Sequence, residues 1–297
     1  MNSYHGRSFQ QRVTSSPLER RPGGEVLKNL IFLTLFLAVI ANAAVGQGNK
    51  KFPMISAHRG SSLVAPENTL ATFSKAIELG ADYIEMDVRT TADGAEVIMH
   101  DESMKRTTGL DTPAEKTTLA EIKKLSAGRE FGKKYEDQKV PTFEEVCVLV
   151  VKENEKRKKP VNLYVDCKSI NAGEVIRLLG QYRLLDFAVF YGDINTLMEL
   201  KKIYEKARLL PAYPGKAELE NVIKKLSPYG FDVSFDQLNE ETVSLCHAKG
   251  IKVFSDLLWS NDKPESYEKA IQLGIDVIQT DKISEVLNVY KKETSQK

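Results

Sequence analysis

Cysteine is scarce in this chain of 297 residues, which contains only three. Cys147, Cys167 and Cys246 form an odd set without CxxC spacing, so the sequence predicts neither a disulfide framework nor a zinc site. A metal ion, if the protein binds one, must therefore be held by oxygen ligands.

An excess of charge of either sign is also lacking. The formal net charge is +1, and a composition of 42% hydrophobic and 28% charged residues is ordinary for a globular protein. Because basic and acidic residues remain nearly balanced after the N-terminal segment is set aside, the sequence predicts no basic patch. We therefore expect no nucleic-acid partner.

The longest apolar run is short for a membrane span. Its centre, Leu30–Ile40, is well below the ~20 residues that cross a bilayer. Basic residues precede it and small residues follow up to Ala43, a pattern typical of a secretory signal with cleavage near Ala43. We expect residues 1–46 to be a signal peptide of a secreted or periplasmic protein. The alternative is membrane anchoring by residues 30–45, the one membrane contact that we expect.

Residues 47–297 have the length and pattern of one large domain. They contain no Gly/Ser-rich or Pro-rich linker, and about 250 residues is typical of a TIM barrel. Short β-type runs alternate with amphipathic helical stretches, in one of which Leu70, Phe73 and Ile77 share a face and Gly80 can end the helix. This alternation predicts a parallel sheet covered by helices, and hence a (β/α)8 barrel. The eight strands are expected at Met54–Ala57, Tyr83–Val88, Val161–Val165, Phe187–Phe190, Arg208–Ala212, Phe231–Phe235, Ile251–Phe254 and Val277–Thr280.

One further strand-like run, Ala95–His100, departs from this alternation. Only "TADG" separates it from the preceding strand, too few residues for a parallel crossover but enough for a turn at Gly94. The two runs should form a hairpin. The polar, turn-rich residues 101–140 then read as a small insertion after the second barrel strand, before a helix that begins near Thr142.

Acidic side chains recur at these strand ends. Glu85 and Asp87 are two residues apart, so on a strand both point to one face. If that face is the barrel interior, their repulsion is relieved by a hard cation, with Mg²⁺ or Ca²⁺ favoured by the absence of Cys and His beside them. The alternative is that they face the helices and form ordinary salt bridges. On the third barrel strand Asp166 can complete the ligand set, and Lys168 on the same face implies an anionic substrate.

Two of the four histidines follow strands. His58 follows the first barrel strand and His100 follows the hairpin strand, with Asp101 beside it. Barrel active sites form at the carboxyl ends of strands, and a pair of histidines suits general acid and base chemistry near neutral pH. Taken singly, each histidine is more often structural.

Together these residues resemble the glycerophosphodiester phosphodiesterase family. The motifs keep their order and spacing over more than fifty residues, and the weaker resemblance extends from about residue 54 to 285. They are His58-Arg59-Gly60, Pro66-Glu67-Asn68-Thr69, Glu85-Met86-Asp87, Thr91-Ala92-Asp93-Gly94, His100-Asp101 and Arg106-Thr107-Thr108.

The resemblance implies a TIM barrel, one divalent cation, and hydrolysis of small-molecule glycerophosphodiesters to glycerol 3-phosphate and an alcohol. It further implies that His58 and His100 are the acid/base pair, that Glu85 and Asp87 are metal ligands, and that Arg59 binds the phosphate. With the inferences above, Asp166 is the third ligand and Lys168 a second phosphate-binding residue.

This sequence departs from the family pattern in places. Asp166 stands where the family usually has Glu, which leaves the choice between Ca²⁺ and Mg²⁺ open. Phe254-Ser255 replaces a Trp-Thr pair near the expected alcohol pocket. Glu67 could orient His58 or reach the metal through water, or its segment could simply begin and cap a helix.

Two other functions remain open at this point. A phosphodiesterase acting on lysophospholipids or phosphoinositides could use a similar barrel, with Leu257, Leu258 and Trp259 as an apolar mouth. A non-catalytic binding protein on the same fold is the alternative from another class.

Overall fold

The computed structural model describes residues 51–295. The predictions of a signal peptide over residues 1–46, of cleavage near Ala43 and of an anchor over residues 30–45 lie outside the described residues. Within the described part of the chain, no helix has both the length and the apolar character needed to cross a membrane.

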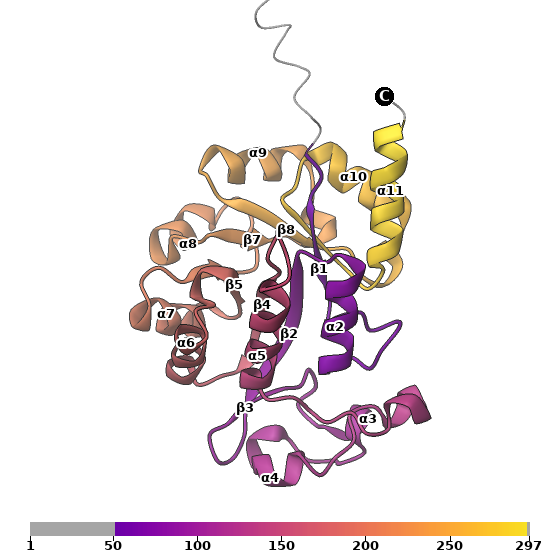
Figure 1. Cartoon of the computed structure of the whole chain (residues 1–297). Helices are drawn as coiled ribbons and strands as arrows, with labels where there is room; N and C mark the ends of the chain where they lie inside the picture. The colour runs from indigo at the N-terminus through magenta and orange to yellow at the C-terminus, as the bar shows by residue number, and fades with distance from the viewer. Residues whose placement is uncertain (1–50, 296–297) are drawn as a thin grey trace, which may run out of the picture. The chain divides into compact units, whose positions relative to one another are not determined.

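The described residues form a barrel of parallel strands, as the sequence predicts (Figure 1). The strand order is β6-β5-β4-β2-β1-β9-β8-β7, and a parallel bridge between Ala212 and Asp232 links the two ends. All eight expected strands are present, with ends that differ by a few residues. They are β1 (Met54–Ala57), β2 (Tyr83–Thr90), β4 (Asn162–Ser169), β5 (Ala188–Tyr191), β6 (Arg208–Leu210), β7 (Gly230–Asp232), β8 (Lys252–Asp256) and β9 (Val277–Thr280).

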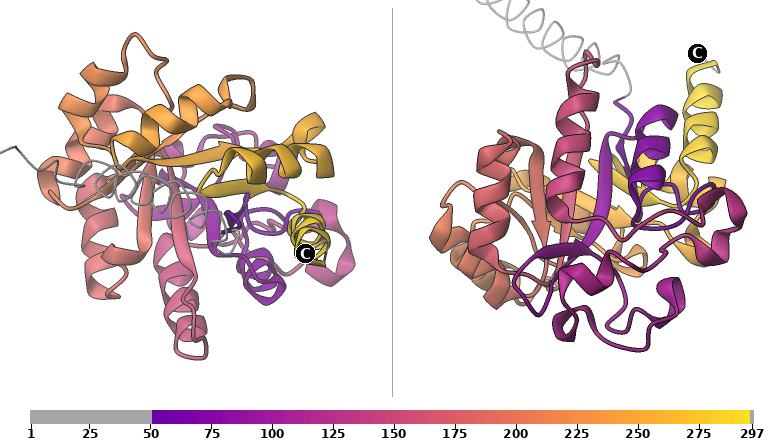
Figure 2. Two further views of the ribbon diagram at one scale, coloured as in Figure 1. Left: turned by 90° about the horizontal axis from the view of Figure 1, so that it is seen from above. Right: turned by 60° about the horizontal axis from the view of Figure 1, so that its bottom comes forward.

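Helices surround the barrel, each following a strand (Figures 1 and 2). The first begins after Thr69, whose hydroxyl accepts the N–H of Thr72, and ends at Gly80, whose φ of 100° suits glycine. The outer helices are α2 (Leu70–Leu79), α5 (Phe143–Asn154), α6 (Ala172–Gln181), α7 (Ile194–Ile203), α8 (Leu219–Leu226), α9 (Glu240–Ala248), α10 (Pro264–Leu273) and α11 (Ile283–Ser295).

Strand alternation separates two apolar regions. One packs the strands against the helices, and the other fills the barrel interior with residues that include Tyr83, Tyr164 and Phe254. Two residues beyond each tyrosine, on the same face of β2 and β4, come Glu85 and Asp166. The barrel interior is therefore apolar at the amino ends of these strands and acidic toward their carboxyl ends.

The hairpin expected after β2 is present. Strand β3 (Glu96–Ile98) pairs antiparallel with β2, and Gly94, at φ 86°, donates its N–H to the Thr91 carbonyl in the turn.

The residues that follow the hairpin, 101–140, contain more regular structure than their polar composition suggests. Their short helical segments are α3 (Lys105–Thr108), η2 (Ala114–Lys116), α4 (Leu119–Ile122), η3 (Arg129–Phe131) and η4 (Lys133–Tyr135). A separate small core that includes Met104, Ile122 and Val140 packs these segments together. The whole segment lies beside β3, at the foot of Figure 1 and in front in the right-hand view of Figure 2.

Candidate active site

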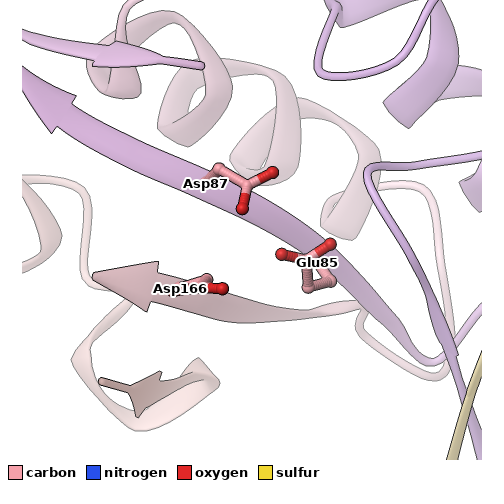
Figure 3. A group of neighbouring side chains, drawn as sticks. All are labelled: Glu85, Asp87 and Asp166. Atoms are coloured by element: carbon pink, nitrogen blue, oxygen red, sulfur yellow. The ribbon is translucent and has the colours of Figure 1, made fainter. Parts of the chain in front are cut away.

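Three carboxylates meet inside the barrel near the carboxyl ends of β2 and β4. Glu85, Asp87 and Asp166 each place an oxygen within 4.8 Å of the others (Figure 3). Asp87 and Asp166 are register partners on the two adjacent strands, and Glu85 precedes Asp87 by two on the same face. The strand pairing therefore gathers the acids, and they do not face the outer helices.

Burial makes this arrangement electrostatically costly without a cation. Glu85 and Asp87 are 2% and 1% exposed. Burial, followed by repulsion from Asp87 and Asp166, raises the pKa of Glu85 well above its usual range. Burial and repulsion from Asp87 likewise raise the pKa of Asp166. A buried set of oxygen ligands that repel one another in this way fits a hard divalent cation such as Ca²⁺ or Mg²⁺.

Neighbouring donors orient these carboxylates. The backbone N–H of Arg59 donates to Glu85 Oε2 at 2.6 Å, and the Asn68 amide donates to Asp87 Oδ2 at 2.7 Å. Asn68 belongs to the segment that precedes helix α2, so the start of this helix is tied to the acidic site.

Lys168 also lies at the carboxylates. Its Nζ is 2.6 Å from Asp166 Oδ2 and 3.3 Å from Asp87 Oδ1. The ammonium group offsets part of the negative charge of these carboxylates.

The loop after β1 brings Arg59 to the same place. Gly60 follows it at φ 85°, and a Cβ there would meet the Thr72 side chain at 2.4 Å, so this turn requires glycine. Arg59 itself has φ 50°, and its Nε is buried without a hydrogen-bond partner among residues 51–295, 3.7 Å from Asp87 Oδ2. A buried guanidinium nitrogen without a partner is ready to donate to a bound anion.

Both candidate histidines line one cavity with these groups. It measures about 390 Å³, and its lining includes His58, Arg59, Glu85, Asp87, His100, Asp166 and Lys168. His58 Nδ1 lies 3.0 Å from Asp281 Oδ1, and His100 Nδ1 lies 2.7 Å from Asp101 Oδ1. With Nδ1 of each ring held by a carboxylate, Nε2 is the nitrogen that can exchange a proton with a bound molecule.

Asp281 is a site residue that sequence reasoning missed. It follows β9, accepts hydrogen bonds from His58 and from the Ser62 hydroxyl, and receives its own support from Asp262, which accepts its backbone N–H at 3.0 Å. The Asp262 carboxylate also accepts the Thr280 hydroxyl at 2.5 Å. The sequence indicates Asp281 through its position directly after the last strand.

Glu67 joins the mouth of the barrel to the insertion. Its carboxylate accepts a hydrogen bond from Arg59 Nη1 at 3.3 Å and from Arg106 at 2.8 and 2.7 Å, whereas the cap of helix α2 is Thr69. Arg106 also binds Asp101, the partner of His100. Glu67 and Arg106 therefore link the Arg59 loop to the His100 loop.

Two further acids lie across the barrel mouth from β2. Asp232 ends β7 and Asp256 ends β8, and both line a cavity beside Tyr191 and Trp259. Sequence reasoning passed over both, because a single aspartate at a strand end has no distinctive local pattern.

Comparison with known proteins identifies the family. The model of the glycerophosphoryl diester phosphodiesterase family matches residues 58–285. A glycerophosphodiester phosphodiesterase of Caldanaerobacter subterraneus is 33% identical over 246 residues, which cover 80% of this chain and 98% of that protein.

Solved structures share the fold. The crystal structure of a glycerophosphodiester phosphodiesterase from Agrobacterium tumefaciens matches with a TM-score of 0.72 at 22% identity and covers 80% of this chain and 100% of its own. An Oleispira antarctica phosphodiesterase in complex with the product sn-glycerol-3-phosphate matches with a TM-score of 0.71 at 25% identity, over 81% of this chain and 97% of its own.

The barrel and these similarities define the protein as a phosphoric diester hydrolase. The chain belongs to the glycerophosphoryl diester phosphodiesterase family.

Proposed function

We propose that the protein hydrolyses glycerophosphodiesters to glycerol 3-phosphate and an alcohol, with one divalent cation, Ca²⁺ or Mg²⁺, and with His58 and His100 as the acid/base pair. The observation that carries the proposal is that one cavity joins both histidines to three carboxylates and two cationic side chains. Family membership supports the reaction, and the product bound to the Oleispira antarctica phosphodiesterase supports the substrate class.

Phosphate binding falls to the charged groups on β2, β4 and the loop after β1. Glu85, Asp87 and Asp166 would hold the cation, which when bound supplies Lewis-acid polarisation of a phosphoryl oxygen. Arg59, with its unpartnered Nε, donates to a phosphate oxygen. Lys168, whose Nζ is 2.6 Å from Asp166 Oδ2, would be the second cationic side chain at the substrate phosphate.

Proton transfer requires one base and one acid. In our proposal His58 Nε2 takes a proton from the attacking group, which is water or the glycerol 2-hydroxyl, and His100 Nε2 protonates the departing alcohol. Asp281 and Asp101 hold the two Nδ1 atoms and stabilise the rings when they carry positive charge.

A long-chain lysophospholipid fits this mouth less well. The apolar rim that such a substrate needs would come from Leu257, Leu258 and Trp259, yet Leu257 and Leu258 are 0% and 3% exposed. Only Trp259 is open, at 81%. A small water-soluble diester is therefore favoured over a lysophospholipid.

Single-histidine variants test the proposal. We expect His58→Ala and His100→Ala to lower kcat for glycerophosphocholine by at least ~100-fold, the usual scale for a positioned acid or base. His247→Ala is the matched control, because its Nε2 contacts Asp276, before the amino end of β9. Near-normal turnover by either site variant, measured as glycerol 3-phosphate released, would contradict the assignment.

A further inference from the structure

A second cavity adjoins the catalytic one, over the carboxyl ends of β6, β7 and β8. It measures about 340 Å³ and shares Tyr191, Asp256, Leu258 and Trp259 with the catalytic cavity. A molecule with its phosphate at the carboxylate triad can therefore extend into this second cavity. Nothing in the proton chemistry proposed above uses it.

The charge of this second cavity is negative. Asp232 and Asp256 end the adjacent strands β7 and β8, which lie side by side in the barrel (Figure 1), and Asp236 follows on the next loop. No Lys, Arg or His is among its lining residues, all of which belong to the described part of the chain. Lys269 lies nearby, 4.3 Å from the Phe235 ring centroid, without lining the cavity.

Asp232 in particular has an oxygen without a partner. Its Oδ1 is buried and accepts no hydrogen bond from any described residue, whereas Asp256 Oδ1 accepts one from Gln279 at 2.7 Å. Burial, with repulsion from Asp256 and then Asp166, raises the pKa of Asp232 well above its usual range. A buried carboxylate without a partner is unfavourable unless a hydrogen-bond donor or a cation reaches it.

Aromatic side chains complete the lining. Tyr191, Tyr213, Phe235 and Trp259 surround the acids. Trp259 stands at the rim, 81% exposed, with a φ of 52° that few non-glycine residues adopt. Carboxylates together with aromatic faces form the surroundings that bind alkylammonium groups.

We propose that this second cavity binds a positively charged alcohol of the substrate, an ammonium or quaternary ammonium alcohol, so that the enzyme selects zwitterionic glycerophosphodiesters. The inference rests on the proposed function. Arg59 and Lys168 lie at the phosphate end of the site, Asp232 lines only the second cavity, and Asp256 lines both. The charges of the site therefore complement those of a zwitterion. A neutral polyol would bring no positive charge to these two carboxylates.

A pair of substrates that differ by one atom tests the inference. Glycerophosphocholine is compared with its neutral isostere, in which the 3,3-dimethylbutyl group replaces choline. We expect kcat/KM to favour glycerophosphocholine by about 10-fold or more, the range of a desolvated cation–aromatic contact. Asp232→Asn and Asp256→Asn should bring this ratio toward one. Asp186→Asn, a surface change before the amino end of β5, should keep the wild-type ratio.

A binding measurement on the full chain separates this inference from the proposed function. Trp259 is the only tryptophan in the chain, so its fluorescence reports occupancy of the rim without turnover. We expect choline to change it at lower concentration than 3,3-dimethylbutan-1-ol, and the difference to vanish in Asp232→Asn.

The outcomes then divide as follows. In an active enzyme, a substrate ratio near one, or a preference for glycerophosphoglycerol, overturns the inference. If no substrate is turned over, the proposed function fails, and the fluorescence titration with the two alcohols alone tests the subsite. Choline-specific binding then supports the subsite, and equal affinity for the two alcohols overturns it.

Discussion

At the scale of single residues, the site depends on side chains that hold other side chains. Asp281 orients His58 and is itself hydrogen-bonded to Asp262. Asp101 orients His100 in the same way and is hydrogen-bonded to Arg106. A carboxylate at Nδ1 fixes the ring tautomer and stabilises the charged imidazole.

Replacing one supporting carboxylate should therefore impair catalysis without blocking binding. We expect Asp281→Asn to lower kcat for glycerophosphocholine at least ~10-fold with little change in KM, because the amide cannot stabilise the charged His58 ring. Steady-state kinetics measure the changes in kcat and in KM separately. Asp276→Asn is the control, since it weakens the His247 contact before the amino end of β9. An unchanged kcat in folded Asp281→Asn would rule out this positioning role.

The sequence identifies the local parts of the site but not those that closure of the barrel brings together. Glu85 and Asp87 are recognisable because strand alternation places them on one face. Asp232 and Asp256 each stand alone at the end of a strand, and Asp281 directly follows another, without a partner nearby in the sequence. Their roles depend on the order in which the strands close, which local patterns do not encode.

At the scale of elements, the β2–β3 hairpin brings His100 to the mouth and is tied to the next helix. Glu96 on β3 is 3% exposed, and its Oε1 accepts the Thr90 hydroxyl and the backbone N–H of Asn171, the cap of α6. Its Oε2 is buried without a partner, and burial raises the pKa of Glu96 to about 7.

This raised pKa makes stability depend on pH. The folded protein holds the Glu96 proton more tightly than the unfolded chain, so the free energy of unfolding falls as pH rises from about 4.5 to about 7. The contribution is at most about 3 kcal/mol.

A glutamine at this position should remove that dependence. We expect Tm to fall less between pH 5 and pH 8 in Glu96→Gln than in the wild type, by a few degrees, because the amide does not titrate. Thermal unfolding at the two pH values measures this difference. Glu199→Gln, an exposed change on α7, should keep the wild-type slope. The same slope in Glu96→Gln would show that Glu96 is not the group responsible.

At the scale of the whole molecule, alternation of strands and helices was enough to predict the barrel. Each of the eight parallel strands lies where a short apolar run predicts it, and the antiparallel hairpin follows from a turn too short for a crossover. The small core of the insertion was not predicted, because residues such as Met104, Ile122 and Val140 are dispersed among polar residues. The barrel mouth combines a side that carries the three carboxylates with Arg59 and Lys168 and a side that is acidic and aromatic, although no stretch of sequence contains both.

Chelation of divalent cations tests directly whether the reaction depends on a metal ion. The released glycerol 3-phosphate is measured with glycerophosphocholine as substrate, before chelation with EDTA, after it, and after Ca²⁺ or Mg²⁺ is added back. In the proposed mechanism, Glu85, Asp87 and Asp166 act only as ligands of the cation. We therefore predict that activity is lost on chelation and returns with one of the two ions. Full activity in the chelated, metal-free protein would contradict the account.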